Sequence, residues 1–138
     1  MMHKIEFRAW DKKEKAMCWV SIIDFEHREC VLVYPTKEYK EKTKSFDEIE
    51  LMQYRNLKDK NNKEIYEGDI VKYKEITECG EKITEKICVV ECTKYGFTPF
   101  IFERDVWEDC WYTIKISDIE IIGNIYENPE LLKEGKKT

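Results

Sequence analysis

The sequence predicts a mainly β protein: a small single domain of short antiparallel strands with SH3-like or barrel character and a short C-terminal helical turn. Three observations support this class. β-Branched and aromatic residues alternate with polar ones over short runs, as in half-buried strands. Turn-forming residues recur about every ten residues, a spacing typical of small barrels and sandwiches. The 138 residues are enough for one core, since a chain of this size buries roughly two-thirds of its unfolded surface.

The N-terminal part of the chain carries three strand signals. Residues 5–9 alternate apolar and polar side chains, residues 11–15 form a polar turn, and residues 17–23 resume an apolar, β-favouring run. This pattern predicts a hairpin with a loop longer than two residues. Residues 30–34 form a third strand that a proline ends, and the lysine-rich residues 36–44 are typical of an exposed loop.

The middle of the chain leaves one choice open. Ser45 and Glu48 have the spacing of a helical capping box, whereas the alternation over residues 49–54 favours a strand. We expect the strand. Residues 59–62 then predict a tight turn, because Asn and Asp tolerate left-handed backbone and hydrogen-bond within their own turns.

The segment Glu67-Gly68-Asp69-Ile70-Val71 is the turn around which we expect the domain to be organised. Gly68 supplies a positive φ that a side chain would resist, and Asp69 caps the turn before the next strand. Both residues are interpreted as determinants of backbone geometry and not as parts of a reactive site.

The C-terminal part predicts further strands and one short helix. Residues 83–92 are rich in β-branched side chains, and residues 97–102 form an edge strand because Pro99 cannot donate to a ladder. Residues 118–126 form a strand in which a glycine, Gly123, indicates a bulge. The following Asn-Pro-Glu sequence predicts a helical turn over residues 129–133. Eight or nine strands result in total.

We expect one domain over residues 1–138. Within it, residues 1–62 supply N-terminal strands and an excursion, and residues 63–132 supply the barrel-like part. The net charge of −5 disfavours binding to nucleic acid, because phosphate binding relies on a basic surface. An 18-residue apolar run and a signal peptide are both missing from the sequence, which predicts a cytosolic protein without membrane attachment.

Six cysteines raise the question of zinc or disulfides. Their spacing lacks the C-x2-C pattern of zinc sites, and Cys88 and Cys92 would stand about 13 Å apart on one strand. We interpret the cysteines as small hydrophobes in a reducing compartment. A composite zinc site with His3 or His27 and a redox role are the alternatives; we expect no cofactor and no metal. The six positions are Cys18, Cys30, Cys79, Cys88, Cys92 and Cys110.

The residues needed for catalysis do not gather in the sequence. Nucleophile elbows, zinc-protease motifs, phosphate loops and dinucleotide glycine motifs are all missing, so we expect a protein that is not an enzyme. Aromatic residues and arginine are enriched at binding surfaces, and they are the better functional lead. The candidate binding surface consists of Arg8, Trp10, Tyr54, Tyr66, Trp107 and Trp111.

Three segments together resemble the YopX family of phage and prophage proteins. They are Ile5-Glu6-Phe7-Arg8-Ala9-Trp10-Asp11; Leu51-Met52-Gln53-Tyr54 continued through Leu57-Lys58-Asp59-Lys60 and Lys63-Glu64-Ile65-Tyr66-Glu67-Gly68-Asp69-Ile70-Val71; and Ile121-Ile122-Gly123-Asn124-Ile125-Tyr126-Glu127-Asn128-Pro129-Glu130-Leu131-Leu132. Where members of the family typically carry Thr-Gly and Asn-Gly, this chain has Arg55-Asn56 and Asn61-Asn62. Both replacements can still adopt left-handed backbone.

The resemblance implies a mainly β protein of phages of Gram-positive bacteria, found in the host bacterial cytoplasm, with no established activity and no catalytic residues to transfer. The leading hypothesis is a non-enzymatic phage accessory protein that binds a protein partner, or a second copy of itself, through an aromatic-rich sheet face or strand edge. The alternative is a nucleic-acid-associated small barrel that stacks bases on aromatic side chains. A metal-dependent or hydrolytic enzyme is the third hypothesis.

Overall fold

The computed structural model describes residues 4–77, 82–93, 96–98 and 115–135, and the chain forms two compact units, Met1–Asn56 and Leu57–Thr138. The fold is mainly β, as the sequence predicts, and the described strand pairs are antiparallel. Along the chain, the division between the two units falls between Asn56 and Leu57. Each unit is described by itself.

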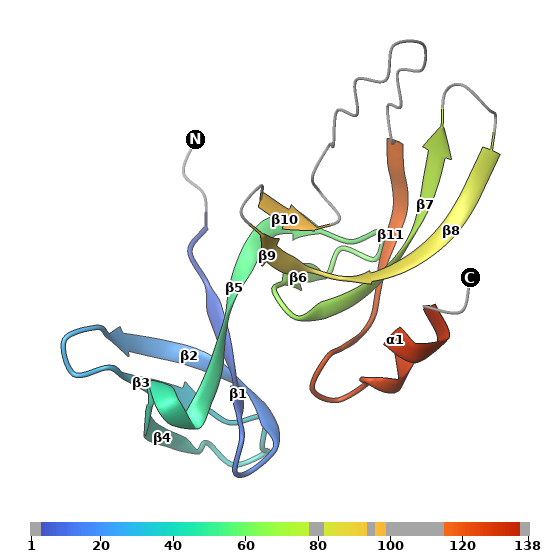
Figure 1. Ribbon diagram of the computed structural model, residues 1–138. Helices are drawn as coiled ribbons and strands as arrows, with labels where there is room; N and C mark the ends of the chain where they lie inside the picture. The colour runs from blue at the N-terminus through green and yellow to red at the C-terminus, as the bar shows by residue number, and fades with distance from the viewer. Residues whose placement is uncertain (1–3, 78–81, 94–95, 99–114, 136–138) are drawn as a thin grey trace. The chain divides into compact units, whose positions relative to one another are not determined.

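The described residues form eleven strands, more than the eight or nine that the sequence predicts (Figure 1). In chain order the elements are β1 (Phe7–Asp11), β2 (Ala16–Asp24), β3 (Glu29–Val33), β4 (Glu41–Ser45), the 3-10 turn η1 (Phe46–Glu48), β5 (Ile49–Lys58), β6 (Glu64–Tyr66), β7 (Asp69–Thr77), β8 (Lys82–Val89), β9 (Glu91–Thr93), β10 (Gly96–Thr98), β11 (Lys115–Asn124) and helix α1 (Glu130–Gly135). The sheets have the orders β4-β3-β2-β1-β5-β6, β10-β9 and β11-β7-β8.

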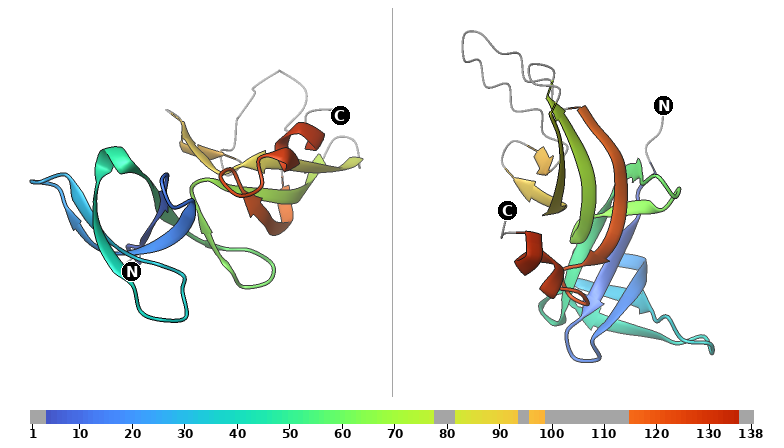
Figure 2. Two further views of the ribbon diagram at one scale, coloured as in Figure 1. Left: turned by 90° about the horizontal axis from the view of Figure 1, so that it is seen from below. Right: turned by 90° about the vertical axis from the view of Figure 1, so that its right-hand side faces the viewer.

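The sheet of the first unit must curl. Strands β4 and β5 lie four spacings apart in the strand order, which is about 19 Å across a flat sheet. The three residues of η1 nevertheless join them, and a 3-10 turn of this length advances only about 6 Å. The first and fifth strands of the row, β4 and β5, therefore come together where η1 joins them, as Figure 2 shows. Backbone hydrogen bonds from Phe46 to Arg28 and from Lys12 to Glu48 fix the closure.

The concave side of this curled sheet holds the core of the first unit. Its fully or nearly fully buried residues are Ala9, Cys18, Cys30, Leu32, Tyr34 and Ile49. Cys18 and Cys30 pack there as free thiols, which confirms their interpretation as small hydrophobes. The first unit is therefore a curled sheet wrapped around one core. Of the strands described after position 62, β6 is the last strand of the six-stranded sheet. The others form a sheet of three strands and a sheet of two strands.

Strand β4 corrects the expected loop over residues 36–44. Only the part before Glu41 is a loop, and the rest pairs with β3 from Val33 opposite Glu41 to Glu29 opposite Ser45. A ladder is made of backbone groups, so a strand at the end of the row needs little apolar side-chain burial, and lysines are common on such strands. For residues 45–54 the sequence leaves open a helical cap or a strand, and the structure has both. Ser45 caps the 3-10 turn η1 by accepting a hydrogen bond from Asp47 N–H, and strand β5 follows.

The turn at Gly68 confirms its predicted geometry. Gly68 has φ of 85° and lies buried between two strands. Its N–H donates to the Val90 carbonyl at 2.8 Å, and its carbonyl accepts from Ile125 N–H at 2.9 Å. The Asp69 carboxylate, 2% exposed, accepts from Tyr66 N–H at 2.8 Å. One turn thus ties together three segments of the second unit.

The turn over residues 59–62 is also confirmed, and it does more than reverse the chain. Asn62 has φ of 66°, and Asp59 Oδ1 accepts from the N–H groups of Asn61 and Lys63, each at 2.9 Å. Asp59 Oδ2 accepts from Ile121 N–H in β11 at 3.1 Å. The buried carboxylate therefore holds the turn and attaches it to a strand sixty-two residues later. Asn56 is left-handed as well, with φ of 58°.

The expected single strand over residues 83–92 is two strands. Val90 interrupts it, because its N–H donates to the Asp69 carbonyl and its own carbonyl accepts from Gly68. Cys88 and Cys92 consequently lie on β8 and β9, which belong to different sheets, and the expectation that they share one strand is wrong. Both are free thiols, and Cys92 is exposed, so its interpretation as a packed small hydrophobe is wrong.

The C-terminal elements follow the sequence closely. The register of β11 against β7 shifts between Ile121 and Gly123, which confirms the predicted bulge. A Cβ atom on Gly123 would lie 2.6 Å from Asn128 Oδ1, so a larger residue would collide there. Helix α1 begins at Glu130, one residue after the predicted start. Part of the edge strand predicted over residues 97–102 is seen as β10, and residues 99–102 lie outside the described residues.

Replacing Gly68 with alanine should lower the free energy of unfolding by about 1–2 kcal/mol, because a Cβ atom is strained in left-handed backbone. Denaturant unfolding measures the loss. Asn62→Gly is the matched control, because it places glycine at another left-handed position and should cost nothing. Equal stability of the Gly68→Ala variant and the unchanged protein would contradict this account of the turn.

Replacing Asp59 with alanine should destabilise the protein by about 3 kcal/mol, because three partly buried N–H groups then lose a charged acceptor. The decisive readout is amide hydrogen exchange at Ile121, which should accelerate in Asp59→Ala. Asp59→Asn keeps one carbonyl oxygen, so its loss of stability should be smaller. Unchanged protection at Ile121 in the alanine variant would show that the contact with β11 has no structural weight.

Candidate interaction surface

The convex side of the curled sheet in the first unit is here called the outer face. Two of its residues on β5, Met52 and Tyr54, are buried, and the others are half-buried or exposed. Residues opposite each other in antiparallel strands share a face, and residues two apart along a strand share it too. Trp19 lies opposite Arg8 and Val33, while Ile22 lies opposite Val31. By this register the outer face consists of Arg8, Trp10, Met17, Trp19, Ile22, Asp24, Glu29, Val31, Val33, Glu41, Thr43, Ser45, Glu50, Met52 and Tyr54.

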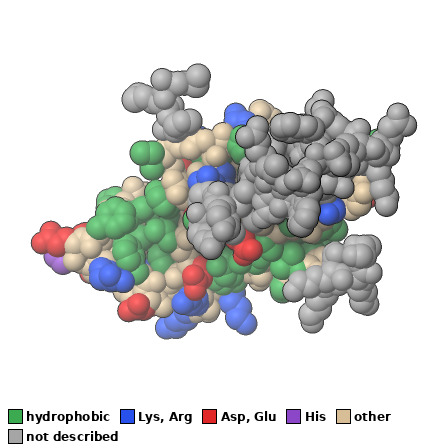
Figure 3. All heavy atoms as spheres, turned by 45° about the horizontal axis from the view of Figure 1, so that its top comes forward, with side chains coloured by type: hydrophobic (Ala, Val, Ile, Leu, Met, Phe, Trp, Pro, Cys, Tyr) green, Lys and Arg blue, Asp and Glu red, His purple; other side chains and the backbone are tan. Residues whose placement is uncertain are grey.

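The centre of the outer face is apolar and open to solvent. Trp19 is 59% exposed and Ile22 is 58% exposed, and their neighbours are half-buried. The centre, here called the apolar patch, consists of Trp10, Met17, Trp19, Ile22, Val31 and Val33. Figure 3 shows hydrophobic side chains gathered on the part of the molecule away from the grey atoms. Contiguous exposed apolar surface on a folded protein commonly marks an interaction site.

Carboxylates frame the apolar patch on three sides. Asp24 and Glu29 lie opposite each other at one end, Glu41 lies on β4, and Glu50 lies on β5. Arg8 is the one cation among the outer-face residues defined above. Three of the acids have partners: Asp24 pairs with His27 Nδ1 at 2.7 Å, Glu50 pairs with Lys12 at 3.2 Å, and Glu41 accepts from the Tyr39 hydroxyl at 2.6 Å. The hydrogen bond from His27 N–H, together with the His27 ring, lowers the pKa of Asp24.

The structure brings together only part of the candidate surface predicted from sequence. Arg8 and Trp10 lie on the outer face next to the exposed Trp19 and Ile22. Tyr54 and Tyr66 are 5% and 9% exposed, so these two side chains offer little surface to a partner. The remaining candidates, Trp107 and Trp111, lie outside the described residues.

Trp19 and Ile22 are missed by sequence reasoning, although β2 contains a signal for them. Its residues 16–20 are all apolar, and so both faces of this strand are apolar. Such runs are typical of strands that are covered on both sides. On the concave side the cover is the core of the unit, with Cys18 and Val20. The convex side, with Trp19 and Ile22, is exposed in the isolated chain.

A second group of polar residues lies at the closure of the curled sheet. The Asp11 carboxylate is fully buried and accepts from the N–H groups of Lys13 and Glu14, at 3.0 and 3.1 Å, and from the Tyr34 hydroxyl. Lys44 Nζ lies 3.9 Å from it. Burial raises the pKa of Asp11, but the Tyr34 hydroxyl, the two N–H groups and the Lys44 charge outweigh burial and leave it below its ordinary value.

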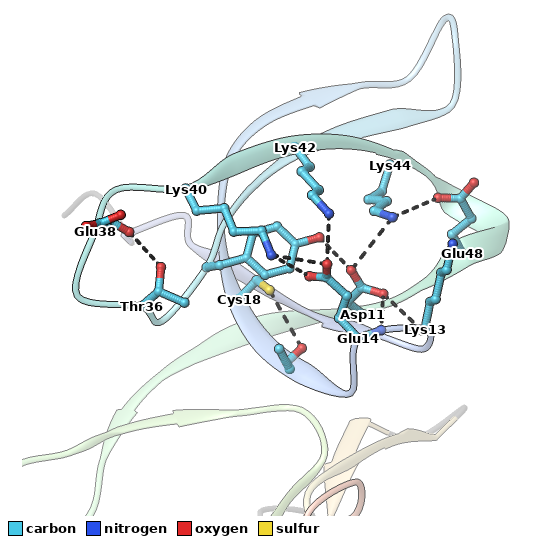
Figure 4. Close-up of polar contacts among 12 residues, drawn as sticks. Asp11, Lys13, Glu14, Cys18, Thr36, Glu38, Lys40, Lys42, Lys44 and Glu48 are labelled. Carbon is cyan, nitrogen blue, oxygen red and sulfur yellow. Dashed lines mark hydrogen bonds and ion pairs between the residues drawn. The ribbon is translucent and has the colours of Figure 1, made fainter.

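Lysines from the loop and from β4 complete this group. Lys40, Lys42 and Lys44 point toward Asp11 and Glu14 in Figure 4. Glu14 accepts from Lys42 at 2.8 Å and from Lys40 at 3.1 Å, and these contacts lower its pKa. Lys40 Nζ also lies 4.6 Å from the centre of the Tyr34 ring, within cation–π range.

This group has the contacts of a structural clasp. Burial and the Asp11 charge raise the pKa of the Cys18 thiol to about 11, so the thiol stays protonated and weakly nucleophilic at neutral pH. Burial and the hydrogen bond to Asp11 raise the pKa of Tyr34, which keeps its hydroxyl protonated. The acids and lysines neutralise one another where β4 comes round to β5. Its chemistry serves closure of the sheet.

Metal binding and membrane insertion are the other functions to consider for the described residues. Among those residues, clusters of three or more His, Cys, Asp or Glu side chains suited to a metal ion are not found. Within the same part of the chain, the helix is too short and too polar to cross a membrane.

A family model for the YopX protein matches residues 6–133. The chain belongs to the YopX family. A solved structure, protein EF1440 from Enterococcus faecalis, is similar at 26% sequence identity and a TM-score of 0.58, and the match covers 95% of this chain and 99% of that chain. A search of curated proteins gives no match.

Membership of the YopX family confirms the resemblance drawn from the three sequence segments. The replacements Arg55-Asn56 and Asn61-Asn62 also keep left-handed backbone, at Asn56 and Asn62. The name of protein EF1440 states no activity. The outer face is therefore the feature from which a function has to be inferred.

Replacing Asp11 with asparagine should cost about 1.5–3 kcal/mol at neutral pH, because hydrogen bonds to a charged carboxylate are lost. The folded pKa of Asp11 is lowered, so its stabilisation is present above the unfolded value and fades as pH falls through the folded value. Denaturant unfolding at pH 7 and at a pH below the ordinary aspartate value of 3.8 measures this. The gap between the variant and the unchanged protein should narrow on acidification.

The control for this pH series is Asp47→Asn, which changes an exposed carboxylate in η1 and should cost little at either pH. A stability gap for Asp11→Asn that is the same at both pH values would contradict a structural role for the charged form.

Proposed function

We propose that this member of the YopX family is a non-enzymatic, phage-encoded accessory protein that works in the cytoplasm of the bacterial host. It binds a protein partner, or a second copy of itself, through the apolar patch of the first unit. The observation that carries the proposal is the exposure of Trp19 and Ile22 within a continuous apolar surface.

The proposal rests on the fact that the core of the unit lies on the other side of this sheet. The concave side already encloses a core, so the apolar residues on the convex side contribute nothing to that core. Exposing Trp19 and Ile22 to water is unfavourable by roughly 1.5–3 kcal/mol per fully exposed large apolar side chain. A partner that covers them recovers this free energy, which is the usual source of affinity at the centre of an interface.

The alternative of nucleic-acid binding has less support from the same surface. Four carboxylates surround the apolar patch and would repel phosphates. The lysines of β4 and the preceding loop form ion pairs with Asp11 and Glu14 and point toward the closure of the sheet (Figure 4). Binding to single strands by stacking on Trp19 would have to overcome this charge.

A photo-crosslinking residue placed at position 22 tests the proposal in the producing cells. We expect a discrete covalent adduct, because the patch is covered there by a partner. The same residue placed at position 83, which is 64% exposed in the second unit, is the matched control and should give no adduct of that mass. Trp19→Ala should reduce the adduct from position 22, because it removes a large part of the contact surface.

The mass of the adduct separates the forms of the proposal. Twice the mass of the chain indicates a second copy, and any other protein mass indicates a different partner. If the crosslinker at position 22 gives only the adducts that it gives at position 83, the patch is ruled out as a protein-binding surface. Crosslinks to nucleic acid alone would favour the alternative.

A further inference from the structure

We propose that the outer face binds one particular kind of partner: a basic amphipathic helix, apolar along one side and flanked by Lys or Arg. This inference rests on the proposed function, since it names the chemistry of the partner at the same patch. Three features of the described residues support it: the pairing of the strands below the patch, the size of the patch, and the sign of the charges around it.

Strand pairing excludes an added strand at the patch. The patch lies on β1, β2 and β3, and each of these strands is already hydrogen-bonded on both sides. An added strand needs an edge with unpaired backbone groups. A partner can therefore meet the patch only with side chains laid across the sheet. Packing a helix on a sheet face is the common way in which proteins cover such a surface.

The size of the patch fits about two helical turns. From the row of Trp10 and Met17 to the row of Ile22 and Val31 is two row spacings, about 13 Å along the strands. The seven-residue span between helix positions i and i+7 covers about 10.5 Å. One apolar stripe of three or four side chains therefore matches the patch from end to end.

The charges around the patch select a basic partner. Asp24, Glu29, Glu41 and Glu50 outnumber Arg8, the outer-face cation, and the charge excess remains when Glu50 is offset by its ion pair with Lys12. A second copy of the chain would bring the same carboxylates against them, and like charges across an interface cost affinity. Anionic lipid surfaces and nucleic acids are repelled for the same reason. Lysines or arginines beside the apolar stripe of a helix would meet these carboxylates at the rim.

The test uses a synthetic amphipathic peptide of about four helical turns, with leucines along one side and lysines elsewhere. A twin peptide carries glutamates in place of the lysines. Dissociation constants are measured by calorimetry with the full chain at low and high salt. We expect the lysine peptide to bind, the glutamate twin to bind much more weakly, and the difference to shrink at high salt because ions screen the rim.

Variants of the chain place the binding site. Ile22→Ser should weaken binding of the lysine peptide about tenfold, because a central apolar contact is lost. Ile83→Ser, an exposed isoleucine in the second unit, should leave it unchanged. The double variant Glu29→Gln and Glu41→Gln should weaken binding several-fold at low salt. The matched double variant Glu85→Gln and Glu127→Gln removes equal charge elsewhere and should have a smaller effect.

The outcomes separate this inference from the proposed function. Equal binding of the two peptides, or equal effects of the two double variants, would overturn the basic partner and leave the patch in place. An unchanged dissociation constant for Ile22→Ser, or no binding of the lysine peptide, would also overturn it. Crosslinking from position 22 in cells decides the proposed function independently. Unfolding midpoints of the variants, measured in parallel, show that each is folded, because these side chains are at the surface.

Discussion

The shortness of the connection between β4 and β5 constrains the whole first unit. Three residues of η1 cannot span a flat sheet of five strands, so the sheet must curl until its first and fifth strands meet. Curling gives the sheet a concave side, where the core packs, and a convex side that the same sheet cannot cover. The exposed patch and the buried clasp are both consequences of this one constraint.

The clasp and the patch divide the charged residues by role. Asp11 and Glu14 bind lysines and backbone groups at the closure, so their charges are satisfied within the unit. The carboxylates around the apolar patch lie at the surface, where a partner can reach them. Negative charges of this acidic chain border Trp19, the largest exposed aromatic residue described. The charge of the chain therefore bears on which partners can bind the patch.

Sequence predicts the features of this protein that depend on neighbouring residues. The positive φ of Gly68, the cap by Asp69 and the bulge at Gly123 follow from local backbone preferences, and each is observed. Contacts between distant residues are invisible to such reasoning, as with Asp59 and Ile121. Strand β4 is not predicted from the sequence, because backbone pairing and not apolar alternation makes it a strand. Trp19 and Tyr54 lie on the same face of the sheet, yet Trp19 is 59% exposed and Tyr54 is 5% exposed, a difference that depends on long-range packing and not on the local pattern.

Radical footprinting of the chain in its producing cells, compared with the purified chain, tests the central claim most directly. The account predicts that Trp19 reacts strongly in the purified protein and is protected in cells, where a partner covers the convex side of the sheet. Tyr39, which is 75% exposed in the loop before β4, should react equally in both. Equal reactivity of Trp19 in both settings would contradict the claim that the apolar patch is an occupied interaction surface.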